Sequence, residues 1–308
     1  MNFLHKINYM KSARYWVIFS VVLSVVSLAA LGLIGLNTGI DFTGGNMFDV
    51  QYEAQVTQAD VTRVVENLVG KNYQVQSAQP KTDCPTCTDF LIRTPQIEEA
   101  TRTQLLTDLE GLGKYKLVGE ENVSGSVSGE LTRKATLAIL LAALLQIVYI
   151  WIRFDFKFGI TAVLALLHDV IITLGLLTLF RVQINSSFVA AILTVLGYSM
   201  NDTVVVIDRI RENLSRRKKG EALEQLTTRS IQEVITRSLF TGVSVQMMLI
   251  SMLIFGGDSI WDMAMTLLIG ITSGTYSSIF IASALWLFWN QWADKRKKAA
   301  PHGKPARA

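Results

Sequence analysis

Six long apolar stretches constrain the fold of this chain more than any other feature of its sequence. A helix needs about 20 mainly apolar residues to cross the hydrocarbon core of a bilayer, and each stretch has 18 or more. Asp169, beside His168, interrupts the third stretch, and Asp202, beside Asn201, interrupts the fourth. The sequence therefore predicts a polytopic α-helical membrane protein with six transmembrane helices. The predicted spans are 15–36, 135–152, 158–180, 184–207, 238–255 and 263–289.

The composition supports this fold class. Hydrophobic residues make up 50% of the chain and charged residues 18%, whereas about 25% of the residues in an average soluble protein are charged. This apolar content, with 21 glycines and only two cysteines, excludes a disordered chain, a collagen-like repeat and a disulfide-rich mini-protein. A net charge of +4 could indicate nucleic-acid binding, but the positions of the charges favour a membrane surface.

Lysine and arginine predict how the chain is oriented, because they favour the cytoplasmic side of a membrane. The segment 208–237 holds eight basic and five acidic residues, whereas the segment 37–134 holds nine basic and fourteen acidic residues. Both termini are therefore expected in the cytoplasm, and the basic run 216–219 is expected to bind anionic lipids and not RNA. The predicted parts are 1–36 (cytoplasmic N-terminus and first span), 37–134 (periplasmic domain and hinge), 135–289 (five-helix bundle with cytoplasmic loop 208–237) and 290–308 (basic cytoplasmic tail).

The outside segment is long enough to bury a core of its own. Its periodicities follow the order β-α-β-β-α-β, which is typical of the split-βαβ, ferredoxin-like fold. A glycine- and serine-rich stretch after the last strand predicts a hinge. The expected strands are 47–52, 73–78, 90–93 and 115–123, the expected helices are 57–68 and 97–109, and the expected hinge is 124–129.

Cys84 and Cys87 form a C-x-x-C motif between the second and third expected strands, and three interpretations apply to it: a redox site, half of a metal site, or a local disulfide. A zinc site needs two more ligands, but the chain has no other cysteine and the segment 37–134 has no histidine. A redox C-x-x-C normally lies at a helix N-terminus. We therefore predict a structural disulfide and no metal or cofactor.

Ionisable side chains inside a bilayer are costly, so they mark candidate functional sites. Asp202 lies near the cytoplasmic end of the fourth span and Arg237 opens the fifth, so the two charges could meet between antiparallel helices. They are expected to form either a static ion pair or a relay in which the carboxylate gains and loses a proton. For His168 and Asp169, in the middle of the third span, a helix–helix hydrogen bond explains the sequence as well as a relay does.

Motifs of known enzymes are absent from the sequence. It contains no G-x-x-x-x-G-K-[ST] phosphate-binding loop, and its two membrane aspartates lack the sequence context of intramembrane aspartyl proteases. The glycine-rich run 39–45 predicts a tight turn before the first outside strand. No enzymatic activity is expected.

Three runs of residues resemble the SecF subunits of the SecD/SecF family, which belong to the bacterial Sec protein translocase and are similar to resistance-nodulation-division transporters. They are Gly-Ile-Asp-Phe-Thr-Gly-Gly at 39–45, Leu-Leu-His-Asp-Val at 166–170, and a run of seventeen residues at 197–213. The resemblance extends over nearly the whole chain. Its signature positions include Gly39, Asp41, Gly44 and Gly45 after the first span, and Asn201, Asp208, Arg209 and Arg211 at the end of the fourth.

The resemblance implies an accessory subunit in the bacterial inner membrane that uses a proton or sodium gradient to promote late, outside-facing steps of protein export. The partners that it implies are SecD, the SecYEG channel, YajC, preproteins in transit and membrane lipids, with no nucleic acid. It associates Asp202 and Arg237 with ion passage, and gives Cys84 and Cys87 no role. The alternatives are a half-size gradient-driven exporter of small molecules or lipids, and a passive scaffold, which would tolerate Asp202→Asn.

Overall fold

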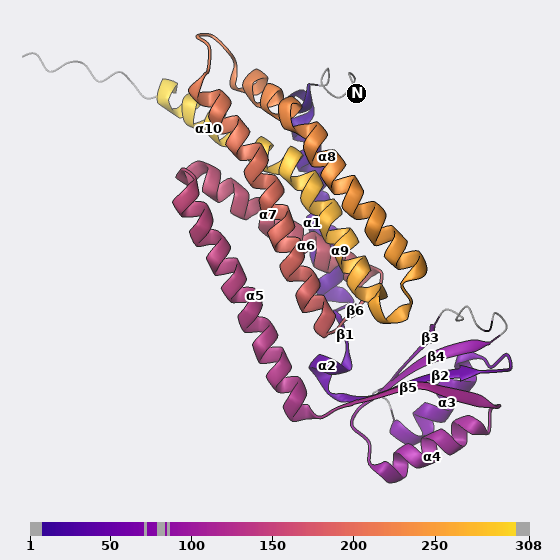
Figure 1. The fold of residues 1–308 in the computed structure, drawn as a ribbon. Coiled ribbons are helices and arrows are strands. Elements are labelled where there is room, and N and C mark those ends of the chain that lie inside the picture. The colour runs from indigo at the N-terminus through magenta and orange to yellow at the C-terminus, as the bar shows by residue number, and fades with distance from the viewer. Residues whose placement is uncertain (1–7, 71–72, 79–83, 85–86, 300–308) are drawn as a thin grey trace, which may run out of the picture. The chain divides into compact units, whose positions relative to one another are not determined.

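The computed structural model describes residues 8–70, 73–78, 84 and 87–299. The chain divides into two compact units (Figure 1). The first consists of the residues up to 37, 139–182 and those from 187 onward; the second consists of 38–138 and 183–186.

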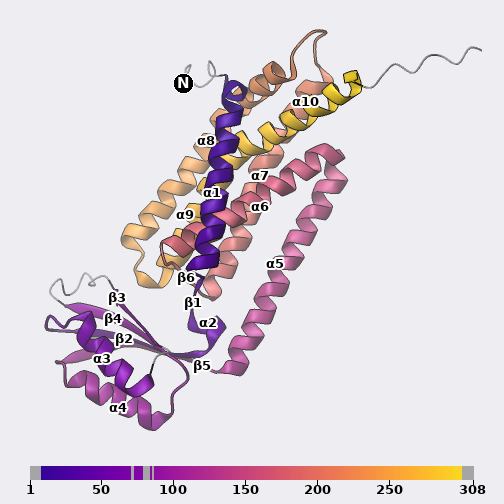
Figure 2. The same ribbon diagram turned by 180° about the vertical axis from the view of Figure 1, so that it is seen from behind.

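Long apolar helices form the first unit, and Figure 2 shows them from behind. Six helical segments in the described residues are long and apolar enough to cross a membrane, which confirms the prediction of a polytopic helical membrane protein. The helices are α1 (Ala13–Leu33), preceded by a 3₁₀ turn (Tyr9–Ser12), α5 (Gly125–Arg153), α6 (Phe156–Leu179), α7 (Ser186–Ser215), α8 (Leu223–Phe255), α9 (Asp258–Ser277) and α10 (Ser283–Ala299). A π-helical turn, Ser278–Ala282, joins α9 to α10, so these elements form one interrupted span.

Two segments that were expected outside the spans are helical. The predicted cytoplasmic loop 208–237 lies mostly within α7 and α8, and only residues 216–222 are not helical. Polar contacts between α7 and α8 explain why both helices extend into the predicted loop. Arg209 bonds Glu233 at 2.6 Å, and Asn213 donates to Ser230 at 3.0 Å. Likewise, α10 extends to Ala299, into the predicted tail.

Most of the predicted hinge at 124–129 is helical, since α5 begins at Gly125 and runs without interruption to Arg153; a hinge motion there stays a prediction. Ser124 stabilises the helix start, because its carbonyl accepts the N–H of Ser128 at 3.0 Å and its hydroxyl accepts that of Val127 at 3.4 Å. Once a first turn is formed, each further residue adds a hydrogen bond at little cost. The glycines therefore do not break the helix.

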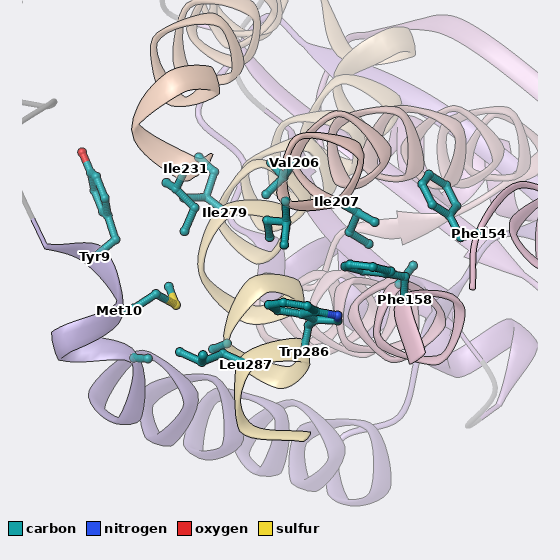
Figure 3. Close-up of a cluster of buried hydrophobic side chains, with 14 of the residues drawn as sticks. Tyr9, Met10, Phe154, Phe158, Val206, Ile207, Ile231, Ile279, Trp286 and Leu287 are labelled. Atoms are coloured by element: carbon teal, nitrogen blue, oxygen red, sulfur yellow. The ribbon is translucent and has the colours of Figure 1, made fainter. Parts of the chain in front are cut away.

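Small residues and stacked rings hold the bundle together. A Cβ atom on Gly175 of α6 would lie 2.1 Å from Cβ of Ser27, so α1 and α6 approach at van der Waals distance, as small residues allow between membrane helices. In Figure 3 the ring of Phe158 from α6 lies against that of Trp286 from α10, and their centroids are 5.0 Å apart. This apolar cluster also takes in Tyr9 and Met10 from the 3₁₀ turn.

The second unit contains an antiparallel sheet in the order β3-β4-β2-β5, consistent with the predicted split-βαβ arrangement. Phe48, Val50 and Ile92 from the sheet and Val65 and Leu105 from its two helices are fully buried in one core. Figures 1 and 2 show both helices on the same face of the sheet. The strands are β2 (Gly45–Tyr52), β3 (Gln74–Ala78), β4 (Thr88–Thr94) and β5 (Tyr115–Val123), and the helices are α3 (Gln58–Val69) and α4 (Glu99–Glu110).

Tyr52 ties the sheet of this unit to its second helix. Its side chain is fully buried, and its hydroxyl donates to the carbonyl of Leu109 at 3.0 Å. Burial raises the pKa of the Tyr52 phenol, so the group keeps the proton that this hydrogen bond requires.

Cys84 and Cys87 are joined by a disulfide in the connection between β3 and β4, with their Cα atoms 5.4 Å apart. Residues 79–83 and 85–86 of this connection lie outside the described residues. That Cys84 and Cys87 are oxidised in the mature protein remains our prediction. Among the described residues, no group of three or more His, Cys, Asp or Glu side chains is arranged to hold a metal ion.

Candidate functional site

Asp169 of α6 lies at the centre of a buried polar cluster in the helical unit. Its residue is fully buried, and three serine hydroxyls donate to its carboxyl group. Ser199 of α7 and Ser277 of α9 donate to Oδ2 at 2.5 and 2.7 Å, and Ser273 of α9 donates to Oδ1 at 3.0 Å. Asp169 therefore connects three helices, and both of its oxygens have partners.

His168 extends this cluster to α1. Its Nδ1 lies 3.0 Å from Oδ1 of Asp169, and its Nε2 lies 2.9 Å from Oγ of Ser20. Ser20 bonds the hydroxyl of Tyr276 at 3.3 Å, and this hydroxyl donates to the carbonyl of Trp16 at 2.9 Å. The predicted helix–helix hydrogen bonding is thus present, but its partners are serines and a tyrosine that the sequence analysis did not identify.

Asp202 of α7 has a different environment. Its residue is 9% exposed, yet Oδ2 is buried without a hydrogen-bond partner among the described residues. Two more buried oxygens on neighbouring helices also lack a partner there: Oγ of Ser238 on α8 and Oγ1 of Thr275 on α9. An unsatisfied buried carboxyl oxygen costs free energy, and such exceptions mark candidate sites for a proton, an ion or water.

Arg237 lies on α8 with an exposed side chain. Within the described part of the chain, Asp202 and Arg237 form no ion pair. Among the described residues, the expected static ion pair is therefore not the observed arrangement.

The signature residues at the end of the fourth span have structural contacts. Asp208 bonds Arg153 at 3.1 Å and Arg211 at 3.0 Å, which links α7 to the end of α5. Arg209 bonds Glu233 of α8, as described above. Asn201 is exposed. These partly exposed charges join α7 to α5 and to α8.

The glycine-rich run 39–45 forms a one-turn helix, α2 (Ile40–Thr43), followed by two glycines with positive φ. Gly45 has φ +128°, and a Cβ atom there would lie 2.2 Å from the carbonyl oxygen of Thr94. Gly39 donates its N–H to Ile184 at 2.8 Å, beside the short pairing of Thr38 in β1 (Asn37–Thr38) with β6 (Gln183–Ile184). Asp41 accepts the N–H of Ser186 at 2.6 Å. The predicted turn is therefore a tightly packed junction in which a side chain at position 45 has no room.

A π-helical turn, which no feature of the sequence predicts, follows directly on Ser277. Ser278, its first residue, shares a hydrogen bond of 2.8 Å with Thr203, the residue after Asp202. Such turns often occur at functional sites. Its sequence, Ser-Ile-Phe-Ile-Ala, carries no glycine or proline that would have marked the irregularity.

Comparisons with known families and relatives agree with the architecture. A family described as "Protein export membrane protein SecD/SecF, C-terminal" matches residues 104–292, and the "SecD/SecF GG Motif" matches residues 29–56. A protein translocase subunit SecF from Sebaldella termitidis is 35% identical over 97% of this chain and 96% of its own length. The SecF of Pseudomonas aeruginosa is 34% identical over 92% of each chain.

Two solved structures of a longer protein, SecDF, are also similar. The crystal structure of SecDF from Thermus thermophilus, described as translocon-associated, superposes with a TM-score of 0.83 at 31% identity. It covers 92% of this chain, which spans 39% of the SecDF chain. A SecDF crystal structure in a "super-membrane-facing form" gives a TM-score of 0.68. The six-span architecture, the two matched families and these full-length relatives show that the chain belongs to the SecD/SecF family of protein export membrane proteins.

Proposed function

We propose that the chain is a non-enzymatic accessory subunit of the Sec preprotein translocase that uses an ion gradient to promote late, outside-facing steps of export. The observation that carries this proposal is the Asp202 carboxyl group, which is buried between helices with one oxygen unpartnered. A static scaffold gains nothing from such a costly group, whereas an ion relay requires one.

SecD is the partner that the comparisons favour. In the related SecDF of Thermus thermophilus, the region similar to this chain makes up 40% of one longer polypeptide, so the rest of that chain accompanies it covalently. In this chain α5 offers a surface for such a partner or for lipid, because its apolar side chains are largely exposed, including Leu140 at 63% and Ile152 at 82%. SecYEG, YajC and preproteins are the further partners that we propose.

The function is tested by preprotein export into membrane vesicles, with and without an imposed gradient. Vesicles that contain the chain together with SecD should export faster when the gradient is applied, and vesicles that lack the chain should not respond. Equal responses would reject the proposal. If a small molecule or lipid is transported instead, the alternative of a half-size exporter is favoured.

We propose that the protein lies in the bacterial inner membrane with both termini in the cytoplasm. In a chain without its native cysteines, Lys218→Cys should react with a membrane-impermeant thiol reagent only after the membrane is opened, and Glu53→Cys should react in intact cells. Both positions are exposed, so accessibility to the reagent depends on the side of the membrane. Labelling of position 218 in intact cells would overturn this orientation.

A further inference from the structure

The hydrogen bonds between His168 and α1 have a fixed direction. The hydroxyl of Tyr276 donates to the carbonyl of Trp16 at 2.9 Å, and a carbonyl can only accept. Because the Tyr276 hydroxyl has one proton, its oxygen accepts the bond from Ser20 at 3.3 Å. Ser20 has then used its own proton, so its Oγ accepts from Nε2 of His168 at 2.9 Å. The contact with Trp16 thus places a proton on Nε2.

The other ring nitrogen then determines the charge of the buried pair. Nδ1 of His168 lies 3.0 Å from Oδ1 of Asp169. A neutral ring with its proton on Nε2 has a bare Nδ1, which would face an ionised carboxylate as one acceptor faces another. A hydrogen bond here needs a proton, either on Nδ1 of an imidazolium or on Oδ1 of a carboxylic acid. Both forms leave the pair with no net charge, which suits its burial among membrane helices.

The surrounding groups are compatible with both forms of the pair. Ser199, Ser273 and Ser277 donate to the carboxyl group whether or not it is protonated. Among the described residues, Tyr276 from α9 is the titratable group whose ring faces the pair, while α1 presents Ser20 and α7 presents Ser199. Asp202 lies three residues after Ser199 on α7. Among the described residues, no charged side chain from outside the pair forms a hydrogen bond or ion pair with His168 or Asp169.

We propose that His168 and Asp169 form a proton-binding site, and that release of the proton breaks a hydrogen bond between α9 and α1. With the proton bound, four protons fill the four contacts Asp169–His168, His168–Ser20, Ser20–Tyr276 and Tyr276–Trp16. When this proton leaves to water, three protons remain for four contacts, and the pair carries one negative charge.

The charge of the carboxylate determines which of the four contacts is left without a proton after release. A full carboxylate makes the strongest of these bonds, so the remaining ring proton moves to Nδ1 and donates to Asp169. Nε2 then accepts from Ser20, whose proton is no longer available to Tyr276. Tyr276 keeps one proton for two acceptors, Ser20 and Trp16, and both belong to α1. Release of the proton therefore weakens the attachment of α9 to α1. This inference deepens the proposed function, on which it rests, because it gives the gradient a second proton site on α6.

The proton state is measured by solid-state NMR on the full chain in lipid vesicles, with ¹⁵N-labelled histidine and ¹³C-labelled aspartate. The His168 signal is identified by its loss in His168→Gln and by its cross-peak to the Asp169 carboxyl. At neutral pH we expect either a doubly protonated ring beside a carboxylate, or a ring protonated on Nε2 beside a carboxylic acid. A neutral ring protonated on Nε2 beside an ionised Asp169, or any neutral ring beside an ionised Asp169 that gains no proton when the pH is lowered, overturns the proposal.

The link to α1 is tested with Tyr276→Phe, which removes the hydroxyl between Ser20 and Trp16 and frees Ser20 to donate to Nε2. The population of rings protonated on Nδ1 and bare on Nε2 should rise about tenfold, as the loss of one hydrogen bond predicts. Tyr149→Phe, on the exposed face of α5, is the matched control and should change nothing. An unchanged ratio in Tyr276→Phe rejects the link. Because these spectra require no export, they can support the site even if the vesicle assay rejects the proposed function.

Discussion

Replacing Asp202 by asparagine is expected to abolish the stimulation of export by an imposed gradient while assembly with SecD is kept. Asparagine preserves the shape of the side chain but cannot exchange a proton. A proton that crosses about 100 mV releases about 2.3 kcal/mol, enough to bias a two-state motion about fiftyfold. Without a group that binds the ion, this energy is not coupled to the protein. The measurement compares export into vesicles with and without the gradient, and co-purification verifies assembly.

Asp155→Asn is the matched control for this substitution. Asp155 is exposed at the start of α6, makes no side-chain capping bond there, and should retain the full response. Arg237→Met should act in the same direction as Asp202→Asn, and the double variant should be no worse than either single variant if the two residues serve one relay. A response like that of wild type in Asp202→Asn would make Asp202 a structural contact only, as a passive scaffold requires.

Gly45→Ala is expected to destabilise the second unit by more than about 3 kcal/mol, because two costs combine at this position. The backbone has φ +128°, which side chains other than glycine rarely adopt, and the added Cβ atom would lie 2.2 Å from the carbonyl oxygen of Thr94. To relieve this contact, β2 must move away from the end of β4, with which it pairs. When opening is fast relative to cleavage, protease digestion of the domain in the full chain should be faster by about a hundredfold.

Gly119→Ala is the control in the same sheet. A Cβ atom there meets only Cβ of Asp49 at 3.7 Å, an ordinary contact, and the residue has no positive φ. It should leave the rate of digestion nearly unchanged. Equal rates for Gly45→Ala and wild type would show that the junction tolerates a side chain and that its glycines serve another purpose.

The helices and strands of the second unit were predicted closely. The expected helix 57–68 is observed as α3, Gln58–Val69, and the expected strand 115–123 matches β5. Alternation and helical periodicity report which face of an element is buried, so they are local signals. At 124–129 the glycines and serines were interpreted as a hinge. In the structure, Ser124 stabilises the start of a long helix that begins at Gly125, and a hinge motion there stays a prediction.

The buried charges were also visible in the sequence, but their environments were not. Asp169 and Asp202 were recognised alike as carboxyl groups in apolar spans. In the structure, Asp169 has partners for both oxygens, whereas Oδ2 of Asp202 has none among the described residues. Serine is common in membrane helices, so Ser199 and Ser277 carry no pattern that identifies them as ligands of a carboxyl group before the helices are packed.

By itself, the sequence determined the six spans, the order of elements in the second unit and the candidate charged residues, because each of these follows from hydrophobicity and periodicity along a few neighbouring residues. Only the tertiary structure decided which partners these charges have. The direction of the bonds from His168 through Ser20 and Tyr276 to Trp16 depends on α1, α6 and α9 meeting at one level, although their residues lie up to 260 positions apart in the chain. Hydrogen bonding depends on distances of a few tenths of an ångström, and helix packing, not local sequence, sets those distances.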